Sequence, residues 1–490
     1  VYLIMDNKNL LKGTMVYTFA NILTKMGSLI FLPIMTRILT QEQFGIIGTL
    51  SPITTLFTVL LGLGLYNAQM KKYVELKENE NELGSYMFTV TAIVITINAL
   101  LFLFLLTPIA EKWFSYIIDL KTISYRPLIL ISIFTAFINA LNTLAITLFR
   151  MKKMYVKVAI GTLISFFTNY ILAVYFIKTL KLGVFGNQMA NLIAVGVLLI
   201  YCFKDYFLKF KFKVKKEYIG YSMKNGLPLI FIELTDQIVN FSDRIVLARF
   251  VDLATVGYYT LAYTAGRVLT VVTGSFVNSW TPEFYEAMKK DPHNRKVTKS
   301  IEDFLAIITI VCVLAQLFAP EAIMLIFPKN YYNAIPYVPI ILAAVVIQAL
   351  YCLDYFFHFH ENSIYILWFT VFAMLFNLGF NLLLIPGNVQ HGALIASWTT
   401  LIAFLLRAAI EMVVIKKKYK VEFDYKKLLI YLFIIINPFI LYLATEDLSI
   451  TKFLLKLLYL GIIMKIMINK VVADKILSIL FRIKGKIIKK

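Results

Sequence analysis

The chain has 490 residues, of which 60% are hydrophobic and only 16% are charged. A soluble protein has about 45–50% apolar and about 25% charged residues, because its surface must carry charge. The composition therefore excludes soluble enzymes and secreted domains and predicts a polytopic membrane protein. The formal net charge of +21 would indicate nucleic acid binding in a soluble protein. Here we interpret it as a bias in the connections between membrane spans, and we expect no nucleic acid partner.

Apolar blocks of about 20 residues, the length of a helix that crosses a bilayer, follow one another along the chain. Unpaired backbone groups are too costly in hydrocarbon, and the ten-residue alternation of a membrane barrel is absent, so we expect helices. The predicted fold is all-α with about 14 transmembrane helices, arranged as two pseudo-symmetric six-helix bundles plus two C-terminal helices. The expected spans are 14–36, 44–66, 85–107, 127–149, 158–178, 184–203, 227–249, 255–280, 301–327, 335–357, 364–385, 391–415, 428–444 and 449–469.

Most of the 49 Lys and Arg residues fall at the two ends of the chain and in the even-numbered connections. Cytoplasmic loops carry such an excess, so we expect both termini in the cytoplasm and the first span to serve as its own insertion signal. The predicted organisation is an N-terminal lobe (1–203), a basic cytoplasmic linker (204–226), a C-terminal lobe (227–415), helices thirteen and fourteen (416–470) and a basic amphipathic tail (471–490) held to anionic lipid.

A nine-residue pattern occurs twice, 212 residues apart, as RILTQEQFG (Arg37–Gly45) and RFVDLATVG (Arg249–Gly257). Thr40 and Asp252 occupy the same register, and each is a suitable N-cap for the span that follows. The glycine that ends each copy permits close helix contact. We interpret the match as an internal duplication, with chance matching among apolar helices as the alternative.

The same offset aligns two sets of polar residues, each stepping by four and then three along one helix face. The sets are Asn21, Lys25 and Ser28 in the first span and Glu233, Gln237 and Asn240 in the seventh. Two halves that meet around a cavity are a common transporter architecture. The stripe therefore predicts a polar cavity between the halves.

Span seven is the most polar of the expected spans. Its polar residues recur at three- and four-residue steps, and they are Glu233, Asp236, Gln237, Asn240, Asp243 and Arg244. A charged side chain at the bilayer centre costs roughly 2.5–3.5 kcal/mol even on the lenient insertion scale. The stripe must therefore face protein or water. Buried ion pairs that hold helices together are one explanation, and a water-filled cavity is the one we favour.

Three cations lie inside expected spans near this stripe: Lys25, Arg244 and Arg267. Arginine offers a bidentate fork for phosphate and lysine a point charge, so together they predict a phosphate-binding cavity. Tyr263 lies one turn before Arg267. The alternative for Arg267 is an ion pair with an acid of span seven.

Other polar residues favour structural roles. Arg407 and Glu411 are spaced as a helical i,i+4 pair. Asp354 and His358 lie one turn apart at the end of a span, where a proton relay and simple solvation are both open and we favour solvation. Cysteines 202, 312 and 352 each lie alone in an apolar run, so we expect lipid-facing or core residues and no metal site. No nucleotide-binding or hydrolase motif occurs, and we expect no enzyme activity and no cofactor apart from a coupling H+ or Na+.

The segment TFANILTKMGSLIFLPIMTRILTQEQFGIIGTL (18–50) resembles the start of bacterial polysaccharide flippases, the O-antigen and capsule repeat-unit transporters. SDRIVLARFVDLATVGYYTLAY (Ser242–Tyr263) resembles the start of their second half. The segment from Asn377 through Pro386 to Ala396 resembles their junction of helices eleven and twelve. These flippases belong to the multidrug/oligosaccharidyl-lipid/polysaccharide (MATE-like) exporter superfamily, and the likeness covers about residues 10–415.

The resemblance implies a bacterial cytoplasmic (inner) membrane flippase that moves a polyprenyl-pyrophosphate-linked oligosaccharide to the outer leaflet by alternating access. It implies that central cations bind the pyrophosphate and that an ion gradient drives turnover. It also suggests that the last two helices form a lipid-tail groove, although Lys456 and Lys465, which we expect to snorkel, blur that picture. Membrane lipid is an expected partner, as are glycosyltransferases or a polymerase of the same pathway.

Applied to this chain, the resemblance and the stripe assign substrate binding to Lys25, Arg244, Arg267, Asn21, Asn240 and Tyr263. They assign coupling to Glu233, Asp236 and Asp243. A multidrug or cation exporter of the same superfamily is the alternative, because it would favour the three acids of span seven. A membrane polysaccharide polymerase is a weaker alternative, since the connections are short.

Overall fold

The structure is a computed structural model that describes residues 2–291, 295–444 and 450–467. Every regular element within these ranges is helical, which confirms the predicted all-α class. The predicted tail at 471–490 lies outside the described residues. The α-helices are α1 (Tyr2–Ile38), α2 (Gln41–Gly62), α3 (Leu65–Leu76), α4 (Glu80–Leu105), α5 (Pro108–Ile117), α6 (Leu130–Met151), α7 (Tyr155–Val174), α8 (Gly183–Tyr206), α9 (Lys216–Phe250), α10 (Leu253–Lys290), α11 (Arg295–Ile326), α12 (Val338–Gln348), α13 (Asp354–Phe359), α14 (Ile364–Leu384), α15 (Gly392–Tyr419), α16 (Tyr425–Ala444) and α17 (Ile450–Met467).

The first compact unit comprises residues 1–261 and 370–396. In it α2 packs against α6 and α9, α7 packs between α1 and α8, and α3 packs against α9. Its core is built from buried side chains such as Leu50, Tyr86, Leu144 and Phe149. Burial of such apolar side chains and close packing, rather than helix propensity, hold these helices together.

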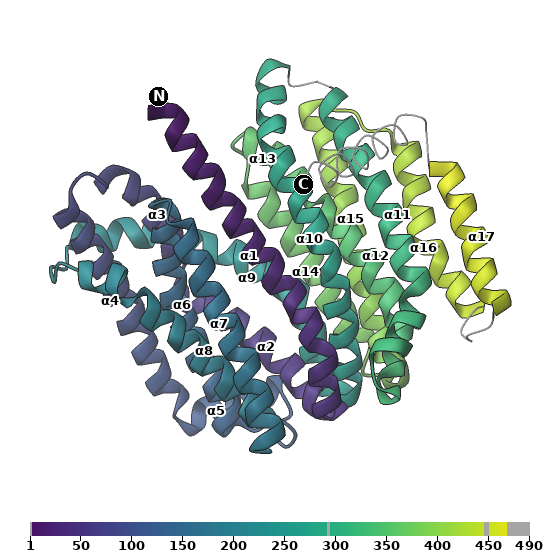
Figure 1. The fold of residues 1–490 in the computed structure, drawn as a ribbon, viewed down its shortest axis with the longest axis horizontal. Coiled ribbons are helices and arrows are strands. Elements are labelled where there is room, and N and C mark those ends of the chain that lie inside the picture. The colour runs from purple at the N-terminus through teal and green to yellow at the C-terminus, as the bar shows by residue number, and fades with distance from the viewer. Residues whose placement is uncertain (1, 292–294, 445–449, 468–490) are drawn as a thin grey trace, which may run out of the picture. The chain divides into compact units, whose positions relative to one another are not determined.

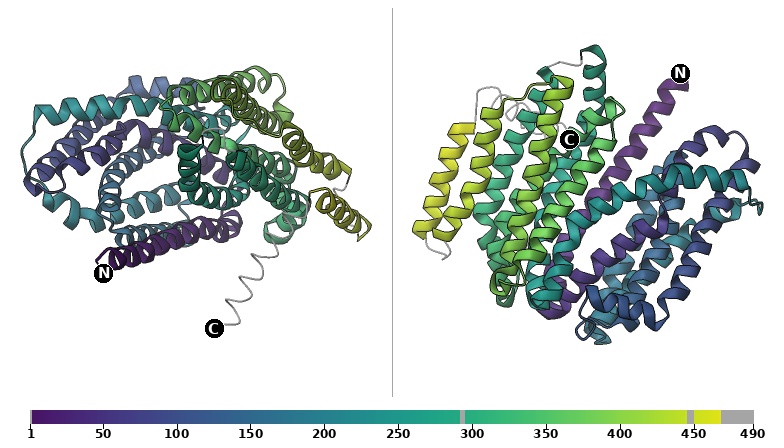
Figure 2. Two further views of the ribbon diagram at one scale, coloured as in Figure 1. Left: turned by 90° about the horizontal axis from the view of Figure 1, so that it is seen from above. Right: turned by 180° about the vertical axis from the view of Figure 1, so that it is seen from behind.

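The second compact unit comprises residues 262–369 and 397–490. Here α11 packs against α12, α16 and α17, and the views in Figures 1 and 2 show α11, α16 and α17 side by side. Ile310 and Val313 of α11 form a small apolar core with Ile434 of α16 and Ile463 of α17. The predicted thirteenth and fourteenth spans are thus real helices that belong to this unit.

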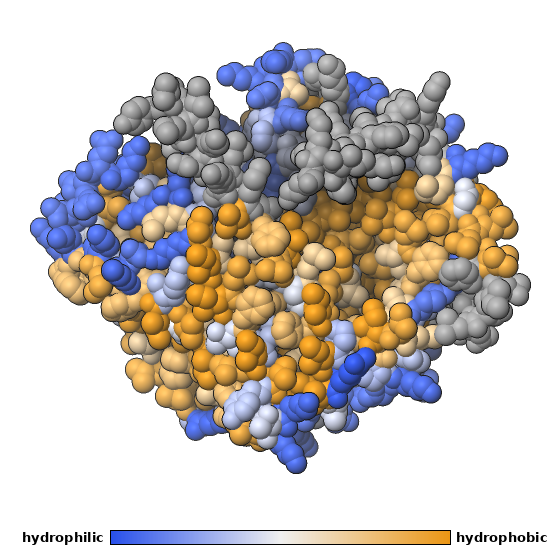
Figure 3. All heavy atoms as spheres, in the orientation of Figure 1, coloured by the Kyte–Doolittle hydropathy of each residue, from blue (hydrophilic) through white to orange (hydrophobic). Residues whose placement is uncertain are grey.

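Nine helices in the described ranges are long and apolar enough to cross a membrane. Large apolar side chains on them are exposed, among them Leu100 and Leu103 of α4 and Leu383 of α14. On the face drawn in Figure 3, apolar residues cover the helix sides, and hydrophilic residues gather toward the helix ends. Exposed apolar surface of this extent requires lipid around it, so the chain is a multi-pass membrane protein. The α9 helix is not one of these nine helices, because its polar stripe makes it too hydrophilic.

Two helices lie in segments that the sequence predicted as connections, α3 and α5. Thr107 is the N-cap of α5, and its hydroxyl accepts a hydrogen bond from the Ala110 amide at 3.5 Å. Pro108 follows as the first residue of the helix. Proline is favoured at that position because its missing N–H would be unpaired there. These helices are short and partly polar, so the search for apolar blocks of membrane length missed them.

The two compact units divide the chain at other points than the predicted lobes do. The α9 helix, expected in the C-terminal lobe, packs with α2 and α3 in the first unit. Three helices, α10, α14 and α15, contribute residues to both units. The predicted lobe boundary at 204–226 stays a prediction.

The two copies of the nine-residue repeat contact each other within the first unit. A methyl group added at Gly45 would lie 1.7 Å from the carbonyl oxygen of Leu253, and one at Gly257 would lie 2.5 Å from that of Gln41. Leu253 and Gln41 are themselves 212 residues apart, so the contact is symmetric about the repeat. This symmetry favours duplication over chance matching.

Both predicted N-caps are confirmed. The Thr40 hydroxyl accepts a hydrogen bond from the Gln43 amide at 3.2 Å, and the Gln43 side chain accepts one from the Thr40 amide at 3.2 Å. The Asp252 carboxylate accepts hydrogen bonds from the Thr255 amide at 2.7 Å and the Thr255 hydroxyl at 2.8 Å. Such caps satisfy amide groups that a helix leaves unpaired at its start.

A Gly45→Ala substitution tests the glycine contact. We expect it to lower the stability of the protein by about 1–3 kcal/mol, because backbone atoms of α10 must move away. Gly196→Ala on α8 is the matched control, since a methyl group there meets nothing within 4 Å. The measurement is the thermal unfolding midpoint of the purified protein in detergent. Equal midpoints for the two variants would show that α2 and α10 do not touch here.

Candidate functional site

Two residues of α3 form hydrogen bonds with the polar stripe of α9. The Tyr66 hydroxyl donates a hydrogen bond to the Glu233 carboxylate, and the Asn67 amide nitrogen lies 3.4 Å from the same oxygen. Both partners precede Glu233 by more than 160 residues in a segment predicted as a span end and a connection. Glu233 is therefore a half-buried carboxylate with two protein donors.

A second polar group lies at the other end of the stripe, where Ser242, Asp243 and Arg244 are all buried. The Tyr259 hydroxyl of α10 donates to the Asp243 carboxylate, and Ser242 donates to Asn377 of α14 at 3.2 Å. The Arg244 guanidinium carbon lies 5.2 Å from the centre of the Phe241 ring. Asp243 and Arg244 are thus two consecutive buried charged residues of the first unit, and neither side chain faces lipid.

The remaining predicted residues are distributed over both units. Lys25 is exposed on α1, and the Asn240 amide donates to the Asp236 carbonyl at 2.8 Å, all in the first unit. Arg267, which is exposed, and Tyr263, which is buried, belong to the second unit. The side chain of Asn21 lies outside the described residues. The convergence of Lys25, Arg244 and Arg267 on one cavity stays a prediction.

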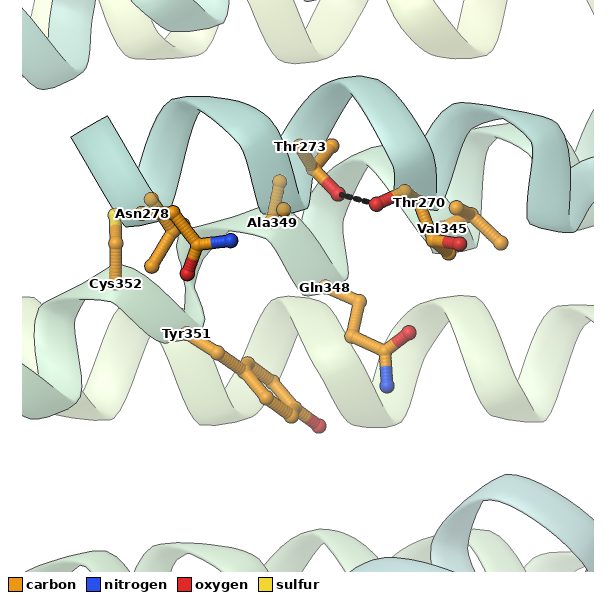
Figure 4. A pocket seen from close by; sticks show the side chains of 10 residues that line it. Thr270, Thr273, Asn278, Val345, Gln348, Ala349, Tyr351 and Cys352 are labelled. Atoms are coloured by element: carbon orange, nitrogen blue, oxygen red, sulfur yellow. Dashed lines mark hydrogen bonds between the residues drawn. The ribbon is translucent and has the colours of Figure 1, made fainter. Parts of the chain in front are cut away.

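The second unit contains a polar cavity of about 290 Å³ between α10 and the segment from α12 to Cys352. Figure 4 shows its polar side chains, which come from both walls. They are Thr270, Thr273, Asn278, Gln348 and Tyr351. Hydroxyl and amide groups of this kind form hydrogen bonds with neutral polar ligands and with water. Sequence reasoning missed the cavity because its polar residues are uncharged.

A buried ionic cluster lies behind this cavity, and we call Arg407, Asp354 and Glu411 the Arg407 cluster. The Arg407 side chain is 2% exposed, that of Glu411 is 0% exposed and that of Asp354 is 17% exposed. Arg407 Nε lies 2.7 Å from Glu411 Oε1, and an Arg407 terminal nitrogen lies 3.0 and 2.9 Å from the two Asp354 oxygens. One guanidinium thus binds two carboxyl groups.

Tyr351 connects the cluster to the cavity. Its ring lies 3.6 Å from the Arg407 guanidinium carbon, and the same residue lines the cavity. A cation over the face of an aromatic ring is attracted by the ring electrons. The ring therefore fixes the guanidinium beside the cavity wall.

The geometry confirms the predicted pairing of Arg407 with Glu411. The prediction that Asp354 is simply solvated is wrong, because Asp354 binds Arg407. Asp354 contacts Arg407 because α13 lies against α15, where the rings of Phe357 and Tyr419 are also in contact, with centroids 5.6 Å apart. The His358 Nδ1 lies 3.0 Å from the Ser363 hydroxyl, and a proton relay between Asp354 and His358 stays a hypothesis. One signal was available: an arginine in a span has five donors, more than a single glutamate can satisfy.

Two further ion pairs of the second unit each contain one buried side chain. Lys456 of α17, expected to snorkel, is instead buried and lies 2.7 Å from Glu321 of α11. Glu302 of α11 is buried, with Arg295 at 3.1 Å and a hydrogen bond of 2.9 Å from the Asp424 amide. The pKa of Asp424 itself, in the connection before α16, is lowered chiefly by the hydrogen bond from the Lys427 amide.

The fold that carries these sites is that of known transporters. The structure of lipid II flippase MurJ in an inward closed conformation aligns with a TM-score of 0.64 over 96% of this chain and 100% of that chain, at 15% identity. An inward-facing multidrug resistance MATE family transporter of the MOP superfamily aligns with a TM-score of 0.62 over 82% and 94%, at 16% identity. An outward-facing transporter of that kind gives 0.54 over 84% and 95%, at 15% identity. The chain therefore has the fold of MOP superfamily transporters.

The family follows from the sequence itself. The family model described as polysaccharide biosynthesis protein matches residues 10–288, more than half of the chain. The chain belongs to this polysaccharide biosynthesis protein family, which confirms the resemblance drawn from its motifs. No curated protein matches the chain.

An Arg407→Leu substitution tests whether the cluster is a buried ionic site. It removes the cation from two buried carboxyl groups, and breaking a buried pair in this way costs roughly 3–5 kcal/mol. We expect a clearly lower unfolding midpoint in detergent. Arg249→Leu, at an exposed position on α9, is the control; it loses one exposed hydrogen bond, to the Ser115 carbonyl at 3.2 Å, and should lower stability much less. Similar midpoints for both variants would contradict the buried cluster.

Proposed function

We propose that this chain is a flippase that moves a polyprenyl-pyrophosphate-linked oligosaccharide from the cytoplasmic to the outer leaflet of the bacterial inner membrane. The observation that carries the proposal is the combination of the polysaccharide biosynthesis family match over residues 10–288 with an alignment to a lipid II flippase over 96% of this chain. Both termini lie in the cytoplasm in this proposal, and the chain transports its substrate without changing it chemically.

The polar sites suit the headgroup of such a substrate. Sugars carry many hydroxyl groups and cannot cross hydrocarbon alone, so a carrier must offer hydrogen-bonding groups inside the membrane. The cavity between α10 and α12 offers hydroxyl and amide groups. Lys25, Arg244 and Arg267 bind the pyrophosphate in this proposal, since guanidinium and ammonium groups bind phosphate by charge-assisted hydrogen bonds.

A second cavity suits the lipid tail. It has a volume of about 460 Å³ and is formed by side chains of α11, α12, α15 and α16. Almost all of its lining is apolar, for example Leu350, Leu406 and Leu432. The expected groove on the last two helices is thus supported for α16, whereas the cavity is lined without α17. In the proposal this groove holds the prenyl chain while the headgroup crosses.

Transport is expected to proceed by alternating access and to be coupled to an ion gradient. The acids Glu233, Asp236 and Asp243 are proposed as coupling residues. The hydrogen bonds from Tyr66 and Asn67 to Glu233 and from Tyr259 to Asp243 support this role, because they hold carboxylates at defined positions within the membrane.

Arg244→Ala and Arg267→Ala test the proposed phosphate ligands. We expect each to abolish export of the surface polysaccharide while the protein level in the membrane stays normal. The measurements are surface polysaccharide staining and immunoblotting of membranes. Lys77→Ala, at an exposed position after α3, is the charge-matched control and should export normally. Normal export by both arginine variants would refute the cationic cavity.

The second candidate is a multidrug exporter, which the three acids of α9 and the alignment with multidrug resistance MATE transporters favour. The two functions differ in the phenotype of a deletion strain. A deletion strain of a flippase loses surface polysaccharide. Complementation of this strain with Arg244→Ala controls for envelope damage, and relative to this control the drug susceptibility of the deletion strain stays unchanged. Restored drug resistance by that variant, with polysaccharide still absent, would favour the exporter.

A further inference from the structure

The Arg407 cluster contains two acids and one cation. Ionisation of both acids would leave a net negative charge in a site where Glu411 is fully buried and Arg407 nearly so. Two carboxyl groups that share a desolvated site do not both ionise readily. Within the described part of the chain, the ion pairs of Asp354 and Glu411 are those with Arg407.

The hydrogen bonds of the cluster independently indicate that the two acids are not both ionised. Arg407 donates to Glu411 Oε1 and to both oxygens of Asp354. Glu411 Oε2 is buried and accepts no hydrogen bond from any group that the structure describes. Asp354 and Glu411 are bound to the same guanidinium group, and a carboxylate has no donor of its own. A proton on one of the acids supplies the missing donor.

Three other titratable residues lie near the cluster: Tyr351, Cys352 and His358. Tyr351 presents its ring face to Arg407. Cys352 is a buried thiol, and a thiol is neutral unless its surroundings favour the thiolate. His358, one turn beyond Asp354, is exposed and bound to the Ser363 hydroxyl. Arg407 is therefore the cation in direct contact with both acids, and His358 acts on Asp354 only through space.

We propose that Asp354 and Glu411 share one exchangeable proton beside Arg407, so that the cluster is a proton-binding site of the second unit. Asp354 is the point of exchange, because it is the partly exposed acid. Tyr351 separates Arg407 from the polar cavity, so loading of the proton changes the charge next to that cavity from negative to neutral. The use of this proton to drive transport rests on the proposed flippase function, whereas its binding does not.

Glu302 provides a contrast within the same unit. It is also a buried acid, but it has its own arginine and a backbone N–H donor. Glu302 thus has a cation of its own and a backbone donor, whereas Asp354 and Glu411 share one cation. Glu302→Gln is therefore the matched control for Glu411→Gln.

The test is proton titration of the full-length protein in detergent, with infrared difference spectra of the carboxylic acid C=O stretch recorded as the pH is varied. Wild type and Glu302→Gln should show a protonated carboxyl band and take up about one proton per chain more than Glu411→Gln. Asp354→Asn should lose the same exchangeable proton. Each single variant keeps one carboxylate partner for Arg407, so both are expected to fold, and the unfolding midpoint verifies this. An unchanged band and proton uptake in both variants would overturn the proposal.

Vesicle transport separates this proposal from the proposed function. The ratio of labelled lipid-linked oligosaccharide translocation with and without a proton gradient should fall to about one in Glu411→Gln and stay at the wild-type value in Glu302→Gln. A normal ratio in Glu411→Gln would remove the cluster from coupling. Absence of translocation by the wild type, with the carboxyl band present, would refute the flippase function and leave the proton site intact.

Discussion

The cost of charge in hydrocarbon governs this structure. A bilayer tolerates charged side chains only where protein or water faces them, and the chain meets that requirement with specific partners contributed by distant helices. Glu233 is bound by Tyr66 and Asn67, Asp243 by Tyr259, and Lys456 by Glu321. These pairs fix which helices lie together, since a helix that moved away would leave a buried charge without its partner.

Local features were predictable from the sequence, and tertiary contacts were not. The N-caps at Thr40 and Asp252 depend on residues three positions away, and the i,i+4 pair of Arg407 and Glu411 lies on one helix. The repeat predicted the close glycine contact because the same constraint occurs twice. The helix α3 was not predicted, because it is short and partly polar.

The missed contacts share one cause. Asp354 is 53 residues from Arg407, and Tyr66 is 167 residues from Glu233, so only the packing of whole helices brings them together. The cavity between α10 and α12 escaped notice for a related reason: threonine, asparagine and glutamine are common in membrane helices and do not stand out as a charge does. A charged residue without an adequate local partner, such as Arg407, is the signal that sequence reasoning can use.

The fold, the family and the arrangement of polar groups together describe a membrane protein with exposed apolar helix faces, a hydrogen-bonding cavity and buried charges. The most direct test of the account is reconstitution of the purified chain into vesicles that contain a labelled polyprenyl-pyrophosphate-linked oligosaccharide. The measured quantity is the fraction of the label that an impermeant glycosidase cleaves as a function of time, because this enzyme reaches only the outer leaflet. We expect label that is initially confined to the inner leaflet to become accessible only in vesicles that contain the protein. Equal accessibility in protein-free vesicles, or none in either, would contradict it.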